Sequence, residues 1–237
     1  MRKQRIWELD AFRGVCILGM VLVHLIFDLQ VFYGLEDFGP VFHFIKDWGG
    51  VLFILLSGTC VTLGSHPVRR GLIVLGCGYL CSLVVWGYSW FCGQMIGDPD
   101  LPAKTIQLRF GILHCLGVCM LLWPVFRKLP GTAVFAAVFV ALGFWFRGMT
   151  VDCPALFPLG LVSPTFASAD YFPLFPNLGW FLLGAALGLH FYREKKTLFP
   201  HFPSNCWPIR FLSFCGRQSL WIYLAHQPLL LLIFEWL

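Results

Sequence analysis

The sequence predicts an all-α fold: a polytopic membrane helix bundle with about seven transmembrane helices and a cytoplasmic N-terminus. Three observations lead to this prediction. The 237 residues are 58% hydrophobic and only 12% charged, whereas about 25% of the residues of a soluble domain are charged. Several apolar runs approach or exceed the ~18–20 residues that a helix needs to cross a bilayer. The basic residues are unevenly divided between the connecting segments. We therefore expect one domain, residues 1–237, in the cell membrane.

Seven apolar runs are the candidate spans. The second run is short and rich in glycine, so we expect it to be tilted or shielded by its neighbours. The turn sequence GDPDLPAK (97–104) separates the third and fourth runs, and RKLPG separates the fourth and fifth. A Pro-rich segment, 147–174, follows the fifth run, and we expect no regular structure in it. The seven runs are residues 11–32, 47–64, 71–92, 109–126, 131–149, 175–192 and 216–236.

The basic residues indicate the orientation of these spans. The segments on one side of the predicted spans carry thirteen Lys and Arg residues, whereas the segments on the other side carry four. The rich side is cytoplasmic by the positive-inside rule, which places the N-terminus inside and the C-terminus outside. The net charge of +5 is thus a signal of topology and indicates no nucleic-acid partner. The rich segments carry Arg2, Lys3, Arg5, Arg13, Arg69, Arg70, Arg127, Lys128, Arg193, Lys195, Lys196, Arg210 and Arg217. The poor segments carry Lys46, Lys104, Arg109 and Arg147.

The ten cysteines do not have the spacing of a metal site. Cys77 and Cys81, like Cys115 and Cys119, lie four residues apart inside apolar runs, where cysteine behaves as a small hydrophobic residue. The sequence contains no CxxC pair and no Cys/His spacing typical of zinc. We predict no metal.

The first span carries four ionisable residues, Asp10, Arg13, His24 and Asp28. Arg13 and His24 are eleven residues apart, which is three helical turns plus about 20°, so the two residues share a face and lie roughly 16 Å apart along the axis. Asp10 and Asp28 lie one turn beyond each end. An arginine that reaches the interface and a histidine bonded to a backbone carbonyl would be a purely structural interpretation. Four ionisable groups on one face instead favour a polar seam that faces the bundle interior, because such groups are expensive in lipid.

The order of these groups predicts a chemistry. Arg13 would lie at the cytoplasmic mouth of the seam, where a cation suits an anionic substrate such as a phosphorylated cofactor. His24 would lie past the middle of the membrane, facing a central cavity. Asp28, four residues on, would orient the imidazole directly or through water, so that its other ring nitrogen takes a proton from a nucleophile.

Four stretches resemble a known family. LDAFRGVCILGMVLVH (9–24) has the Arg–ten residues–His pattern of the transmembrane acyltransferases, which include polysaccharide O-acyltransferases and heparan-alpha-glucosaminide N-acetyltransferase-like proteins. LRFGILHCLGV (108–118) and YFPLFPNLGWFLLGAALG (171–188) resemble the second branch, and GRQSLWIYLAHQP (216–228) resembles the last-helix motif of the wider group. The similarity therefore extends over residues 9–228.

This resemblance implies transfer of an acyl group, most often acetyl, from cytoplasmic acyl-CoA to an acceptor sugar on the other side of the membrane. Arg13, His24 and Arg109 match motif positions, and Arg69 and Arg70 are further cations for the CoA head. In the lysosomal N-acetyltransferase the position that matches His24 is Asn, and its catalytic His comes later, nearest to His43 here. Either His24 or His43 is therefore the candidate base, and we favour His24. Arg109 is equally well explained as an interfacial anchor.

Alternative functions remain open at this stage. A small-molecule or glycolipid transporter would also have a polar seam, although we find no inverted repeat. A retinal-type receptor is excluded because residues 216–236 contain no lysine. For His226 in the HQP sequence we favour a structural role, in which the ring satisfies the backbone carbonyl that Pro228 leaves free one turn earlier. The expected partners are the lipid bilayer, acyl-CoA and a carbohydrate acceptor, and the sequence leaves a homodimer open.

Overall fold

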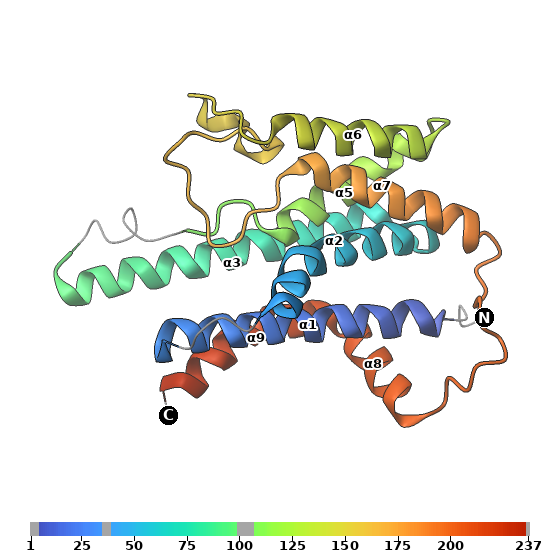
Figure 1. The fold of residues 1–237 in the computed structure, drawn as a ribbon, viewed down its shortest axis with the longest axis horizontal. Coiled ribbons are helices and arrows are strands. Elements are labelled where there is room, and N and C mark those ends of the chain that lie inside the picture. Colours follow the sequence, from blue (N-terminus) through green and yellow to red (C-terminus); the bar gives the residue numbers. More distant parts are fainter. Residues whose placement is uncertain (1–4, 35–38, 99–106, 236–237) are drawn as a thin grey trace. The chain divides into compact units, whose positions relative to one another are not determined.

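The computed structural model describes residues 5–34, 39–98 and 107–235, most of which are helical (Figure 1). Each of the seven predicted spans coincides with a helix, so the predicted all-α bundle is confirmed. Within the described residues, α1, α2, α3 and α7 are long and apolar enough to cross a membrane, whereas α5, α6 and α9 are shorter apolar helices. The elements are α1 (Trp7–Tyr33), α2 (Pro40–Leu63), α3 (Pro67–Ile96), α5 (Ile112–Phe126), α6 (Thr132–Phe146), the 3₁₀ helix η1 (Pro154–Leu159), α7 (Leu174–Phe191), α8 (Trp207–Arg217) and α9 (Ser219–Glu235).

Two of these elements were not predicted. Helix α8 is amphipathic, with polar and basic residues between its aromatic ones, so a search for long apolar runs does not find it. The 3₁₀ helix η1 lies in the Pro-rich segment 147–174, where the expectation of no regular structure was wrong. Pro154 begins η1 with a suitable fixed φ, and Gly160 ends it at a φ of 110°, a conformation that favours glycine. Arg2, Lys3, Lys104 and residues 99–104 of the predicted turn lie outside the described residues.

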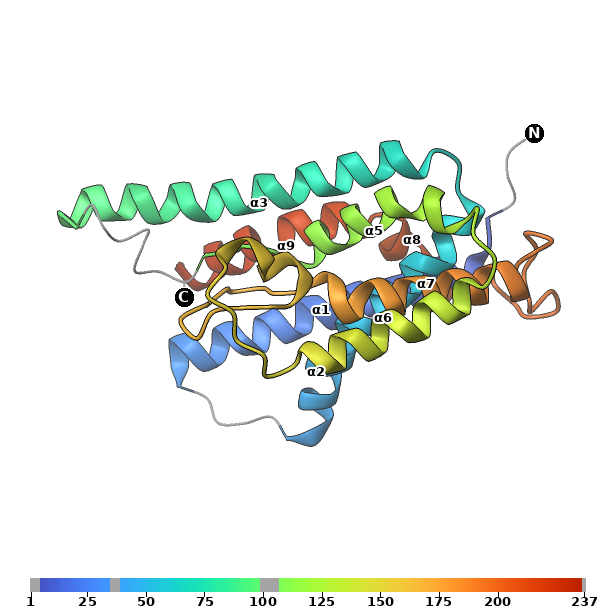
Figure 2. The same ribbon diagram turned by 90° about the horizontal axis from the view of Figure 1, so that it is seen from above.

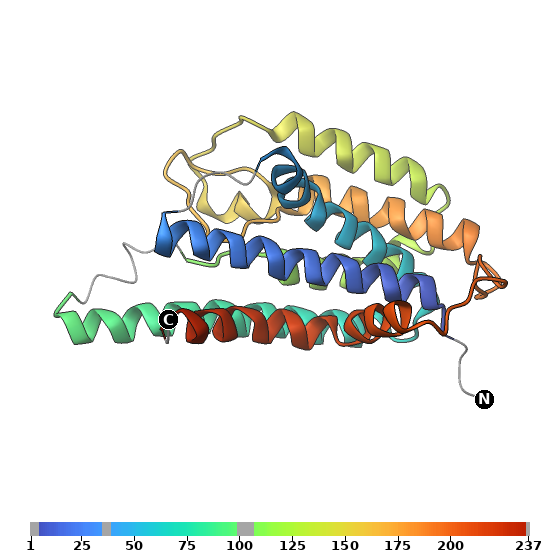
Figure 3. The same cartoon turned by 60° about the horizontal axis from the view of Figure 1, so that its bottom comes forward.

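The chain forms two compact units, one of Met1–Leu56 with Leu187–Leu237 and one of Ser57–Ala186. The predicted single domain, 1–237, stays a prediction. In the first unit, α8 and α9 both pack on α1. Gly14 lies against Leu212 and Asp10 against Gly216, so α8 runs antiparallel to α1. α9 runs parallel to α1, as Figure 3 shows, which agrees with a first and a last span that cross in the same direction.

The N-terminal end of α1 is fastened to the segment before α8. Glu8 accepts hydrogen bonds from the hydroxyl of Thr197 and the backbone N–H of Leu198, both at 2.8 Å. The ring of Trp7 stacks on Phe202, with ring centroids 5.2 Å apart. Both segments are predicted to be cytoplasmic, and their contact agrees with that assignment.

The second unit is built on close approaches of helices at glycine. In this unit α3 lies along α5 (Figure 2), with Gly71 against the backbone of Gly117. Gly58 of α2 lies against the carbonyl of Phe181 in α7, and Thr59 beside it donates a 2.9 Å hydrogen bond to the carbonyl of Gly184. Small residues are what membrane helices use to approach closely.

The connection between α6 and α7 is ordered by polar bonds. The Tyr171 hydroxyl donates a 2.6 Å hydrogen bond to the carbonyl of Phe157 in η1, and burial raises the pKa of Tyr171 to about 12. Asp170 accepts a 3.0 Å hydrogen bond from the backbone N–H of Ile112. This bond satisfies one of the free N–H groups at the start of α5, which explains why the helix begins at Ile112 and not at Arg109.

Candidate active site

The candidate site lies along the parallel helices α1 and α9 of the first unit (Figure 3). His24 of α1 faces His226 of α9, with the ring centroids 4.7 Å apart and the ring planes at 78°. Farther along the same two helices, Tyr33 faces Phe234 at 6.0 Å. The parallel arrangement thus brings the ionisable face of α1 onto the HQP sequence of α9.

The hydrogen bond of His24 defines its neutral form. Its Nδ1 lies 3.0 Å from the carbonyl oxygen of Met20. A carbonyl oxygen only accepts hydrogen bonds, so Nδ1 carries the proton and Nε2 of the neutral ring is an unprotonated acceptor. The bond to a backbone carbonyl is the one that the structural interpretation of His24 expects. It also leaves His24 in the tautomer that a general base needs, because the outer nitrogen is free to take a proton.

His226 has the same tautomer for the same reason. Its Nδ1 lies 2.5 Å from the carbonyl oxygen of Tyr223, which is one residue before the carbonyl that we expected it to satisfy. The side chain is only 9% exposed, and its Nε2 has no hydrogen-bond partner among the described residues. Two imidazolium charges at the 4.7 Å separation of these rings would repel each other by roughly 3.5 kcal/mol at an effective dielectric constant of about 20.

Asp28 makes no direct hydrogen bond to His24, although a direct bond was one of the two ways in which we expected it to orient the imidazole. Both oxygens of its carboxylate accept from Nε2 of Gln227, at 3.2 and 3.1 Å, and the side chain is only 4% exposed. Within the described residues no hydrogen bond joins Asp28 to His24, whose Nδ1 is taken by Met20. The physical reason is geometric: the carboxylate turns towards α9, where a donor lies, so it fastens α1 to α9 next to the histidine pair.

The bond between Asp28 and Gln227 predicts a measurable coupling. We expect Asp28→Ala and Gln227→Ala each to lower the free energy of unfolding by about 1–3 kcal/mol, because each leaves a buried polar partner without its bond. The double variant should lose less than the sum of the single losses. Thermal unfolding of the four proteins in detergent measures this. Asp28→Asn is the matched control, because its amide oxygen still accepts from Gln227; additive single losses would contradict the bond.

A cationic cluster surrounds Asp10 near the N-terminal end of α1. Arg5, Arg13 and Arg217 all lie close enough to Asp10 to interact electrostatically, and Nη1 of Arg5 is 3.8 Å from the carboxylate. Three guanidinium groups against the two carboxylates of Asp10 and Glu8 leave an excess of positive charge at this end of α1. Arg13 is only partly buried, and an excess of positive charge suits an anionic group. The predicted role of Arg13 in binding an anionic substrate stays a prediction.

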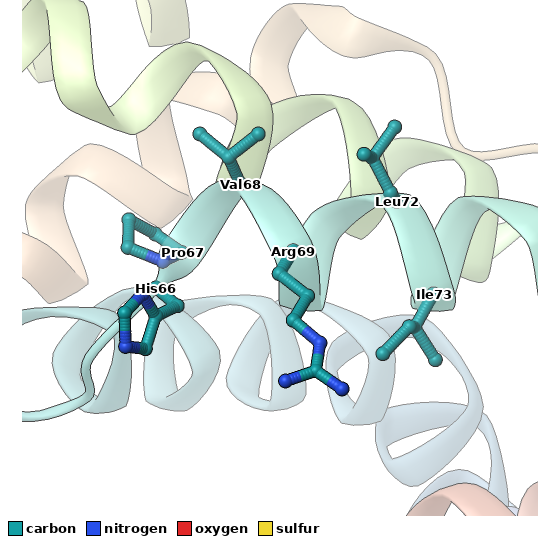
Figure 4. Close-up of a pocket in the computed structure, with 6 residues that line it drawn as sticks. All are labelled: His66, Pro67, Val68, Arg69, Leu72 and Ile73. Carbon is teal, nitrogen blue, oxygen red and sulfur yellow. The ribbon is translucent and has the colours of Figure 1, made fainter.

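Arg69 and Arg70 belong to the second unit, at the start of α3. Arg69 is exposed and lines a shallow hollow with His66, Pro67, Val68, Leu72 and Ile73 (Figure 4). In Figure 4 the Arg69 side chain points to the opposite side of the helix from Val68. The guanidinium of Arg70 lies against Gly64, at the end of α2. Their predicted role in binding the CoA head stays a prediction.

Arg109, the other matched arginine, also belongs to the second unit. It is exposed and precedes α5. Its guanidinium lies 5.4 Å from the centroid of the Phe166 ring, and its backbone N–H donates to the Ser168 hydroxyl at 3.1 Å. These contacts attach it to the η1–α7 connection, which supports the interpretation of Arg109 as an anchor.

His43 is exposed near the start of α2, with its ring 5.9 Å from that of Phe42. It belongs to the first unit. The choice between His24 and His43 as the base stays a prediction. The histidine ring that His24 contacts is that of His226. The central cavity that we expect at His24 also stays a prediction.

Reasoning from sequence did not assign three residues to the site: His226, which it gave a structural role, Gln227 and Arg217. The HQP sequence was a usable signal, because it puts two polar side chains into an apolar span. Arg217 was used only as one of the basic residues that indicate the cytoplasmic side of the membrane. Among the described residues no group of three or more His, Cys, Asp or Glu side chains is arranged to hold a metal ion.

Comparison with known families supports the resemblance. Residues 5–228 match the family described as heparan-alpha-glucosaminide N-acetyltransferase, catalytic. No curated protein and no solved structure matches the chain. The match includes both α1 and α9 through Pro228, the two helices that carry the candidate site. The chain, whose helices include several long and apolar enough to cross a membrane, thus belongs to the family of heparan-alpha-glucosaminide N-acetyltransferase catalytic domains.

Proposed function

We propose that this protein is an acyl-CoA-dependent transferase of the cell membrane. It moves an acyl group, acetyl in the simplest case, from cytoplasmic acyl-CoA to a hydroxyl or amine of a sugar or glycan on the other side. The observation that carries the proposal is the tautomer of the neutral His24 ring in a member of an N-acetyltransferase family: Nδ1 donates to the carbonyl of Met20, which leaves Nε2 as the acceptor.

The cationic cluster supports an anionic donor. Acyl-CoA has a large phosphorylated head that crosses hydrocarbon only at a high energetic cost. Arg13 and Arg217, near the predicted cytoplasmic end of α1, would hold that head, with Arg69 and Arg70 as further cations. The thin pantetheine arm then runs along the polar face of α1 and brings the thioester to the level of His24, roughly 16 Å further along the helix.

The chemistry needs one base and no covalent enzyme intermediate. The oxygen or nitrogen of the acceptor attacks the thioester carbonyl while Nε2 of His24 takes its proton. The C–S bond then breaks, and the proton on His24 passes to the departing thiolate, which leaves as the CoA thiol.

The decisive experiment is a transfer assay in proteoliposomes. Purified protein is given acetyl-CoA labelled in the acetyl group on the cytoplasmic side and a panel of sugar acceptors on the other side, and products are identified by mass. We expect label on one or more acceptors, together with release of CoA thiol. Movement of an unmodified sugar or glycolipid across the bilayer without acetylation would overturn the proposal in favour of a transporter.

Arg13→Ala is expected to raise KM for acetyl-CoA by about 10- to 150-fold, because a hydrogen bond to a charged group contributes about 1.5–3 kcal/mol. kcat should change little, since Arg13 contacts the head and not the reacting carbon. Steady-state kinetics with varied acetyl-CoA measures both constants. Arg127→Ala is the matched control, an exposed arginine on the predicted cytoplasmic side. An unchanged KM in Arg13→Ala, or an equal rise in Arg127→Ala, would contradict this role.

A further inference from the structure

Two buried hydrogen-bond acceptors of α9 have no donor among the described residues. They are Nε2 of His226 and Oε1 of Gln227. Nε2 is an acceptor because the proton of the ring is on Nδ1, which donates to the carbonyl of Tyr223. Oε1 is the free end of an amide whose Nε2 is held by Asp28, since a carboxylate accepts and does not donate. Buried acceptors without a donor are uncommon and energetically costly. This pair therefore indicates a bound molecule that donates hydrogen bonds to it.

The same place holds a third acceptor. In the neutral ring of His24, Nε2 is an acceptor because Nδ1 donates to Met20, and this ring lies edge-on to that of His226, with centroids 4.7 Å apart. His24 is only partly buried, so the cluster extends to the surface. The three acceptors thus lie on the two helix segments that the His24–His226 ring contact and the Asp28–Gln227 hydrogen bonds join. A molecule with several O–H or N–H groups close together would satisfy them, whereas a thioester, which has only acceptors at its reacting end, would not.

We propose that His226 and Gln227 form the subsite for the acceptor substrate. Nε2 of His226 and Oε1 of Gln227 receive hydrogen bonds from the hydroxyl or amine groups that flank the reacting one, while His24 removes the proton of the reacting group. The substrate class that fits is a polyhydroxylated or aminated ring, such as a sugar, rather than a molecule with a single donor. This inference rests on the proposed function, because it assigns the acceptor side of the same reaction.

A purely structural role for His226 makes the opposite prediction for two substitutions. The amide of asparagine occupies the place of Nδ1, so His226→Asn keeps a donor to the Tyr223 carbonyl and removes the acceptor at Nε2. Glutamine reaches the place of Nε2, so His226→Gln keeps an acceptor there and removes the donor to Tyr223. A subsite role therefore ranks His226→Gln above His226→Asn in activity. A structural role ranks them in the reverse order.

The test uses acetyl-CoA and glucosamine as probes with the full chain in proteoliposomes. We expect His226→Asn to lower kcat/KM for glucosamine by roughly 10- to 100-fold, as for an unmade buried hydrogen bond, with KM for acetyl-CoA unchanged. His226→Gln should stay within about 5-fold of the unmodified protein, since a hydrogen-bond acceptor remains. Gln227→Glu, which keeps an acceptor but places a second carboxylate against Asp28, should lose transfer. Thermal unfolding of each variant reports the structural effect separately.

The outcomes separate this inference from the proposed function. Transfer by the unmodified protein with His226→Asn fully active and His226→Gln impaired would overturn the subsite and leave the transferase intact. No transfer by the unmodified protein would overturn the proposed function. Binding of glucosamine, measured as a shift in the unfolding temperature, then decides the subsite alone. A shift that is lost in His226→Asn and kept in His226→Gln supports it, and a shift equal in all three proteins, or absent from the unmodified protein, overturns it.

Discussion

Replacing His24 by alanine is expected to abolish acyl transfer while leaving the binding of acetyl-CoA largely intact. Removal of a positioned general base lowers kcat by about 10²- to 10⁴-fold. Nε2 of His24 is the base in our proposal, because Nδ1 is committed to the Met20 carbonyl. Arg13 lies about three turns away along α1, and Arg5 and Arg217 lie near Asp10, a further turn away, so the site for the CoA head should persist. Steady-state kinetics and equilibrium binding of acetyl-CoA measure the two effects separately.

His24→Asn is the matched variant for this prediction. Its amide keeps a donor to Met20 but carries no base, so we expect it to fold like the unmodified protein and to be as inactive as His24→Ala. His43→Gln tests the rival candidate and should keep most of the activity. Near-normal turnover in His24→Asn, with loss of turnover in His43→Gln, would move the base to His43.

A single methyl group at Gly14 or Gly216 is expected to prevent the first unit from packing. A Cβ at Gly14 would collide with the carbonyl of Leu212, and one at Gly216 with the carbonyl of Asp10. Both obstacles are backbone, which cannot rotate away as a side chain does. Forced overpacking costs about 1–3 kcal/mol where side chains can shift, and more where the backbone must move. We expect Gly14→Ala and Gly216→Ala each to lower the free energy of unfolding by at least about 3 kcal/mol.

The controls for this prediction are Gly76→Ala and Gly87→Ala in α3. Nothing lies within 4 Å of a Cβ at either position, and alanine is the better helix former by about 0.5–1 kcal/mol. These variants should therefore be as stable as the unmodified protein or more so. Unfolding temperature and yield of monodisperse protein in detergent report the result. Equal stability of all four variants would show that α1 and α8 do not pack as described.

These contacts explain part of the family motifs in physical terms. Gly14 ends the LDAFRG sequence and Gly216 begins the GRQSLWIYLAHQP sequence. In the structure each glycine lies against the backbone of the helix that carries the other. Close approach at small residues is how membrane helices gain packing without a hydrophobic driving force. The two motifs thus join α1 to α8, next to the cations Arg13 and Arg217 that they also contain.

The sequence by itself determined the fold class, the positions of seven apolar helices and the polar face of α1. These features are local. A sufficiently long apolar run and a spacing of eleven residues on one helix can be recognised without knowing which helix packs against it. The sequence also predicted His24, Asp28 and Arg13 as the ionisable groups of one face, and the family match over residues 5–228 supports the acyltransferase resemblance.

Only the tertiary structure decided what those groups contact. Asp28 and Gln227 are 199 residues apart in the chain, and nothing in local periodicity says that α1 and α9 lie in parallel contact. Asp28 was therefore assigned to the nearest histidine, although its carboxylate is held by α9. His226 was likewise assigned to a backbone carbonyl alone, because its ring partner His24 belongs to the other end of the chain. Amphipathic α8 was missed because its apolar face is short and is completed only by packing on α1.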